Sequence, residues 1–140
     1  MNLYLDTSSL IKHYLQEPGT DTVKRLVAEA SSVAASLVSY VETRSALARG
    51  QRAGRLTAQE YARAVAGFET DWRRYTTMDV APQLVQLAGD LAAKHCLRGL
   101  DAIHLASALM LRDSLGEPVT FSAGDERLMA AAAAEGLAIP

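Results

Sequence analysis

Short β-prone runs alternate with helix-forming segments along most of the chain, and this alternation constrains the fold more than any other feature. The runs predicted to be strands are Asn2 to Leu5, Ser32 to Leu37, Thr76 to Val80 and Val119 to Ser122. Strands separated by helices favour a parallel sheet covered on both faces, because each right-handed crossover returns the chain to the same end of the sheet. We therefore predict a single α/β domain over residues 1–140, with a short parallel sheet of about four or five strands flanked by helices on both faces.

Apolar residues recur at helical spacing between those strands. Two sequences of the form S/T-x-x-E begin at Ser39 and Thr57 and resemble capping boxes, so they predict the starts of two helices that form a hairpin. The segment from Leu100 to Leu111 is apolar on nearly every side, as expected of a buried central helix. Other helices are predicted after Asp6, Thr20, Pro82 and Asp125, and a short closing strand at Leu137 to Ile139.

Length and charge limit the classes of function. A chain of 140 residues is long enough to bury a core of its own. Its formal net charge of −2 argues against holding nucleic acid by bulk attraction, so any such contact must be local. Arginines at 44, 49, 52 and 55 form one local basic run. A solvated helix face is the more common explanation of such a run, unless a phosphate-cleaving site lies nearby.

The amino-terminal sequence, the lengths of the apolar runs and the single cysteine bear on secretion, membrane insertion and disulfide formation. The amino terminus lacks the basic start and apolar run of a signal peptide, and no apolar run reaches the roughly 18 residues that span a bilayer. We therefore expect a cytoplasmic protein without a membrane partner. Cys96 is the only cysteine, which excludes an intrachain disulfide, and we interpret it as a small buried hydrophobe.

Four acidic residues lie at strand-to-helix junctions or at a helix head: Asp6, Glu42, Asp101 and Asp125. Each alone has a structural explanation as a helix cap or capping-box residue. Together they are expected to meet, because the carboxyl ends of parallel strands lie along one edge of a sheet. Converging carboxylates repel one another and need a counter-charge. Oxygen ligands alone favour Mg²⁺, with Mn²⁺ as a possible substitute, and such a site suits a phosphate ester substrate.

The segments that carry these acids resemble successive motifs of VapC-type PIN domains. They read DTSSLIKHYL from Asp6, SYVETRSALAR from Ser39, LRGLDAIHLASAL from Leu97 and DERLMAAA from Asp125. They occur in the same order and span nearly the whole chain. The DAIHLASAL segment is the most specific of them, whereas DTSS means little by itself.

The resemblance implies a Mg²⁺-dependent endoribonuclease, the toxin of a type II toxin–antitoxin pair, with all four acids around the ion. It also implies that Thr7 or Ser8 contacts metal-bound water or phosphate. The expected partners are an RNA substrate, a cognate VapB-type antitoxin and a second copy in a homodimer. The chain departs from the family pattern in one place, because relatives often carry Thr or Ser two residues before the last acid. Here that position is Ala123, and Ser122 precedes it.

Other polar and aromatic residues have simpler interpretations. His104 lies three residues after Asp101 but between apolar neighbours, which favours a hydrogen-bonded core histidine over a general base. Arg98 is predicted either to neutralise a neighbouring carboxylate or to bind a substrate phosphate. Phe68, Trp72 and Tyr75 have the spacing of a packed helix face or dimer interface rather than a base-stacking surface.

Three alternative functions remain to be weighed. A phosphoacceptor signalling module usually pairs acids near its first strand and carries a late lysine, but Asp6 has no acidic neighbour and no lysine follows Lys94. A haloacid-dehalogenase-like phosphatase needs a second aspartate two residues after the first, where this chain has Ser8. A catalytically inactive Mg²⁺-binding scaffold of the same fold is compatible with the sequence and is separated from the nuclease only by an activity test.

Overall fold

The strands form where the alternation of the sequence predicts them. The computed structural model describes all residues from Met1 to Pro140. The four strands are β1 (Asn2–Leu5), β2 (Ser32–Ser36), β3 (Thr76–Met78) and β4 (Val119–Ser122). They form one parallel sheet in the order β3-β2-β1-β4. The predicted closing strand is reduced to one bridge between Ala138 and Thr120, so the sheet has four strands rather than five.

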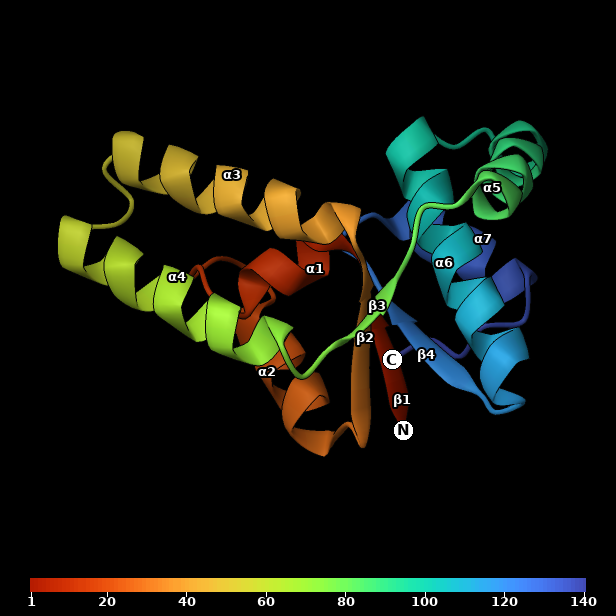
Figure 1. The fold of residues 1–140 in the computed structure, drawn as a ribbon, viewed down its shortest axis with the longest axis horizontal. Helices are drawn as coiled ribbons and strands as arrows, with labels where there is room; N and C mark the ends of the chain where they lie inside the picture. The colour runs from red at the N-terminus through yellow and green to blue at the C-terminus, as the bar shows by residue number, and fades with distance from the viewer.

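Seven helices cover the sheet from its two sides (Figure 1). On one side lie α1 (Thr7–Lys12), α2 (Thr20–Glu29), α3 (Val38–Arg52) and α4 (Ala58–Trp72), and the last two project away from the sheet as a hairpin. On the other side lie α5 (Pro82–His95), α6 (Gly99–Leu115) and α7 (Glu126–Ala134). None of these helices combines the length and apolar composition that crossing a membrane requires.

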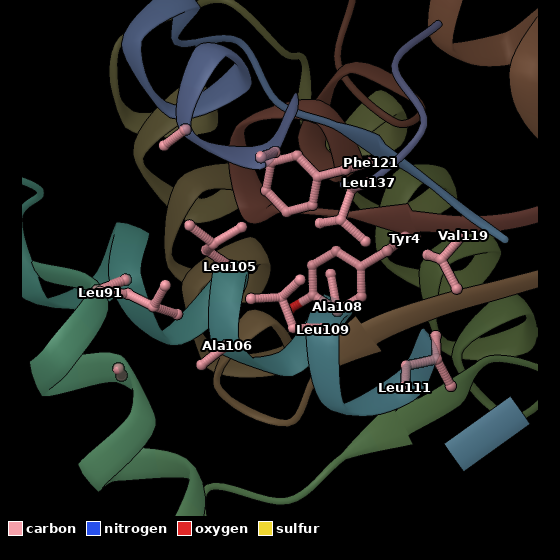
Figure 2. Close-up of a cluster of buried hydrophobic side chains, with 14 of the residues drawn as sticks. Tyr4, Leu91, Leu105, Ala106, Ala108, Leu109, Leu111, Val119, Phe121 and Leu137 are labelled. Carbon is pink, nitrogen blue, oxygen red and sulfur yellow. The ribbon is translucent and has the colours of Figure 1, made fainter. Parts of the chain in front are cut away.

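Alternate residues of β1 point into two separate cores. Leu3 and Leu5 pack with α1, α2 and α4, whereas Tyr4 packs with α5, α6 and α7. Figure 2 shows this second cluster, in which the Tyr4 ring is stacked on Phe121 with centroids 5.6 Å apart. Successive side chains of a central strand point to opposite faces of the sheet, and both are buried where helices cover both faces. The buried inner side of α6, including Leu105, confirms its prediction as a central helix.

The aromatic residues of α4 pack against the first core. The ring of Phe68 is fully buried and lies 5.5 Å from Trp72 and 5.7 Å from Tyr40, centroid to centroid. The Trp72 ring contacts Tyr75 edge-on. These contacts confirm the predicted packed helix face.

Two local predictions are wrong. Thr57 and Glu60 do form a capping box at the start of α4, but α3 begins at Val38 after Leu37, which makes no side-chain cap. The side chain of Ser39 is instead buried against the β1–α1 junction. Cys96 is exposed rather than buried, and it occupies the left-handed position that ends α5, with φ 54°.

Candidate active site at the carboxyl edge of the sheet

Asp6 lies at the end of β1 and caps α1. Its Oδ1 accepts hydrogen bonds from the Ser9 amide at 2.9 Å and the Ser8 hydroxyl at 2.7 Å, and only 4% of the residue is exposed. Burial raises the pKa of the Asp6 carboxyl, the two hydrogen bonds oppose that rise, and the negative charge of Asp101 adds to it. Asp6 is therefore a buried acid whose charge the protein alone compensates only in part.

Asp101 lies in the first turn of α6 and is joined to Asp125 through one arginine. Arg98 Nε is 3.2 Å from Asp101 Oδ2, and Arg98 Nη2 is 3.9 Å from Asp125 Oδ2. The three residues line a common hollow of about 280 Å³. The Arg98 side chain is 83% exposed, so its guanidinium group is accessible to a ligand. This placement agrees with both predicted uses of the arginine.

Asp125 is the N-cap of α7. Its Oδ1 accepts hydrogen bonds from the amides of Arg127 and Leu128 at 2.8 and 3.3 Å, while Oδ2 faces Arg98. Capping occupies one carboxylate oxygen and leaves the other directed toward the site. The structural and the functional interpretations of this residue are therefore compatible.

Glu42 reaches the site from α3. Its Oε1 accepts a hydrogen bond of 2.6 Å from Thr7 Oγ1 and lies 3.5 Å from His104 Nε2. His104 and the Thr7 hydroxyl hold the pKa of the Glu42 carboxyl below its ordinary value, against the effect of burial. Glu42 is therefore expected to remain a carboxylate with one oxygen fixed in place.

A buried chain of polar groups stands behind Glu42. Tyr4 Oη lies 3.0 Å from His104 Nδ1, and His104 Nε2 lies 3.3 Å from Thr7 Oγ1. Because Nε2 also faces the Glu42 carboxylate, it is the nitrogen expected to carry a proton. Burial raises the pKa of the Tyr4 phenol, which therefore keeps its hydroxyl hydrogen. These bonds orient Glu42 from within the core.

His104 is thus both a satisfied core histidine, as predicted, and a contact of an acid in the site. His104 is only 3% exposed, and both of its ring nitrogens have polar partners. The sequence reasoning missed the contact with Glu42. The available signal was the spacing of three residues from Asp101, which places both side chains on one face of α6.

The hydroxyl groups of Thr7 and Ser8 are engaged with carboxylates. Thr7 donates to Glu42, and Ser8 donates to Asp6 while accepting a 2.8 Å bond from the Gly124 amide. Ser8 thereby ties the loop before α7 to α1. The hydroxyl of Ser122 lies 2.9 Å from that of Ser9. Ser122 is therefore a neighbour of the Asp6 cap, and its hydroxyl is hydrogen-bonded to Ser9 rather than to Asp125.

The predicted acids lie along one edge of the sheet, but not as a closed cluster. No three His, Cys, Asp or Glu side chains stand close enough to hold a metal ion together. The donor chemistry nevertheless fits Mg²⁺, because the groups are carboxylate oxygens. The hydrogen bonds of Asp6 go to Oδ1 and that of Glu42 goes to Oε1, which leaves Oδ2 and Oε2 for a ligand.

Comparison with known proteins identifies the family and the fold of the chain. Residues 3–135 match the family model described as PIN domain. Ribonuclease VapC45 of Mycobacterium tuberculosis is 35% identical over 135 residues, which are 96% of this chain and 91% of the relative. Ribonuclease VapC46 of the same species is 31% identical, over 98% and 95% of the two chains. The crystal structure of M. tuberculosis VapC20, a toxin that cleaves the sarcin–ricin loop, has a TM-score of 0.66 and 21% identity, covering 96% of this chain and 95% of VapC20.

Proposed function

The chain belongs to the PIN-domain family of VapC ribonucleases, and on that premise we propose that it is a Mg²⁺-dependent endoribonuclease acting as the toxin of a type II toxin–antitoxin pair. The observation that carries the proposal is the buried carboxylate of Asp6, which has a raised pKa, a negative neighbour in Asp101 and a free Oδ2. A divalent cation near such a group would favour its charged form.

All four acids surround the ion in this proposal. Asp6, Glu42 and Asp101 would hold the ion, and Asp125 would complete the set from the head of α7. When bound, Mg²⁺ or Mn²⁺ supplies charge neutralisation at the phosphate and lowers the pKa of a coordinated water. Hydrolysis by water leaves a 3′-hydroxyl and a 5′-phosphate.

The surrounding residues position those acids and the substrate. Thr7 and Ser8 each hold a carboxylate through one oxygen, so that the other oxygen is directed to a ligand. Arg98 carries the exposed guanidinium group nearest to Asp101 and Asp125, and its planar donors suit a substrate phosphate. This arginine would then exchange a carboxylate partner for phosphate when RNA binds.

A cognate antitoxin and a second copy of the chain are the proposed protein partners. Support for the antitoxin comes from the VapC names of the relatives and from toxin–antitoxin complexes among proteins of the same fold. The proposed place of action is the cytoplasm, where the RNA substrate is found. Size measurement with and without the co-expressed antitoxin tests both partners.

The nuclease proposal is tested by cleavage of RNA with Mg²⁺, with EDTA, and with Asp6→Asn and Asp101→Asn. We expect cleavage only by the unchanged protein with the ion, and products that bear a 5′-phosphate. Asp90→Asn, an exposed acid on α5, is the matched control and should cleave normally. Binding of Mn²⁺ followed by electron paramagnetic resonance gives a second readout, in which Asp6→Asn weakens binding. Activity that survives EDTA or both substitutions would refute the proposal.

A further inference from the structure

A basic groove lies beside the acidic site, between α1 and α3. The groove has a volume of about 360 Å³, and its lining includes Ser8, Lys12, Arg49 and Arg55. A second hollow of about 280 Å³ is lined by Val41, Glu42, Ser45 and Arg49. Arg49 belongs to both, so the two hollows meet at its side chain.

Each hollow includes a residue that belongs to the acidic site or contacts it. Ser8 donates to Asp6 at the start of the groove, and Glu42 itself lines the second hollow. Arg49 lies seven residues after Glu42, which is about two turns or 10 Å along one face of α3. In Figure 1, α3 leads outward from the carboxyl end of the sheet. The groove therefore follows α3 away from the acids.

The charge of the groove is positive although the chain as a whole is negative. Lys12 and Arg55 share one acidic partner, Glu17, at 3.4 and 3.7 Å. Arg49 forms no ion pair and is hydrogen-bonded only to Ser45. Three cations thus line the groove with one carboxylate, and the exposed Arg49 guanidinium group is the one without an acidic partner.

The other two arginines of the same basic run are placed differently. Arg44 is paired with Glu69 of α4 at 2.8 Å and contacts the Tyr40 ring. Arg52 is exposed and lies outside both hollows. Of the four arginines in the basic run, only Arg49 and Arg55 therefore line the groove.

We propose that this groove binds the sugar–phosphate backbone of single-stranded RNA on one side of the scissile bond, with Arg49 as the main phosphate contact. The inference rests on the proposed nuclease function, because the acids at the start of the groove define where the strand is cut. The lining of the groove on α3 also includes Ala46, Gly50 and Ala53, whose small size leaves room for a strand. A charged channel without base-stacking aromatics binds backbone rather than sequence.

The test measures binding of fluorescein-labelled single-stranded RNA by anisotropy in EDTA, where the strand is not cut. Arg49→Ala is expected to weaken binding about tenfold and to reduce the slope of log affinity against log salt by about 0.7, the value for one lost phosphate contact. Arg52→Ala is the matched control, because it removes the same charge from the same helix outside the groove. It should change affinity less than about twofold.

A gain of affinity provides an independent check. Glu17→Gln removes the one acid of the groove and releases both of its cationic partners, so RNA binding should become about threefold tighter. Arg49 and Arg52 are exposed, and thermal melting is expected to be unchanged in their variants. A loss of affinity with an unchanged melting temperature therefore reports on contact with RNA.

Two results would overturn the inference. One is equal RNA affinity of Arg49→Glu and Arg52→Glu. The other is an Arg49→Glu variant that still binds RNA but no longer binds a poly-glutamate peptide, which would assign the groove to an acidic protein partner. Failure of the nuclease proposal looks different: the unchanged protein would then not cleave RNA with Mg²⁺, while Arg49-dependent binding in EDTA persisted.

Discussion

Removing the phenol hydroxyl of Tyr4 tests whether the buried polar chain controls the acidic site. Tyr4→Phe keeps the ring stacked on Phe121 but removes the group 3.0 Å from His104 Nδ1. The ring nitrogen is then buried without a partner, which costs about 1–3 kcal/mol of unfolding free energy. A loss of about 2 kcal/mol lowers the melting temperature of a domain of this size by about 4–8 °C.

The same substitution is expected to reach Glu42. Without the hydrogen bond from Tyr4, His104 is less firmly held beside Glu42 Oε1, although the Thr7 hydroxyl remains at 2.6 Å. Losing a group that orients a metal ligand typically weakens metal binding by about 10-fold to 100-fold. Because Thr7 is retained, we expect about tenfold weaker Mn²⁺ binding. Electron paramagnetic resonance titration of free Mn²⁺ measures this change without RNA or cleavage.

A double-mutant cycle separates this effect from general destabilisation. In a Glu42→Gln background, Tyr4→Phe should cause little further loss of Mn²⁺ affinity, because the residue through which it acts is already changed. Tyr75→Phe is the matched control, since it removes a part-buried hydroxyl bonded to Tyr14 at 2.6 Å in a different cluster. Unchanged Mn²⁺ affinity in Tyr4→Phe, or an equal loss in both backgrounds, would refute the reasoning.

Three further predictions concern single side chains. The pKa of Asp6 is raised in the folded protein, so its ionisation opposes folding as pH rises from about 3.8 through the native pKa. Asp6→Asn should therefore have a higher melting temperature than the unchanged protein at neutral pH in EDTA. A difference in melting temperature that did not disappear on acidification would contradict this. The pKa of Glu135 is lowered by its lysine and histidine partners, so its contribution is present above about 4.5 and lost as pH falls through the native pKa. Glu135→Gln should cost about 0.5–1 kcal/mol at neutral pH and nothing in acid, as checked by denaturant titration at several pH values. A Cβ on Gly124 would lie 3.1 Å from both Ser8 Oγ and Lys12 Nζ, so Gly124→Ala should shift the Ser8 hydroxyl slightly and weaken Mn²⁺ binding. Gly89→Ala, which meets nothing within 4 Å, should leave Mn²⁺ binding unchanged.

Much of the fold was predictable because its signals are local. The strand Asn2–Leu5 and the helix after Thr57 follow from residue periodicity and turn chemistry, which neighbouring residues determine by themselves. The approximate place of the acids was also predictable, because a residue directly after a parallel strand must lie at the carboxyl edge of the sheet. Their assignment as metal ligands stays a prediction.

The failures share one physical cause. Ser39 and Glu42 have the form of a capping box, yet they bond to Thr7 of the neighbouring helix α1, because that partner becomes available only when β1 and β2 are adjacent. Cys96 is exposed at the C-cap of α5, and its exposure depends on how the end of that helix packs, which composition does not record.

The sequence by itself determined the alternation of strands and helices and the approximate place of the acids at one edge of the sheet, because both follow from short-range periodicity. The need for a cation beside those acids, inferred from charge repulsion, stays a prediction. Tertiary structure decided which polar groups meet, such as His104 with Glu42 and Tyr4. It also decided that Arg49, and neither Arg44 nor Arg52, lines the groove. Such pairings join residues far apart in the chain, and their energies depend on distance and burial, which exist only after the helices have packed on the sheet.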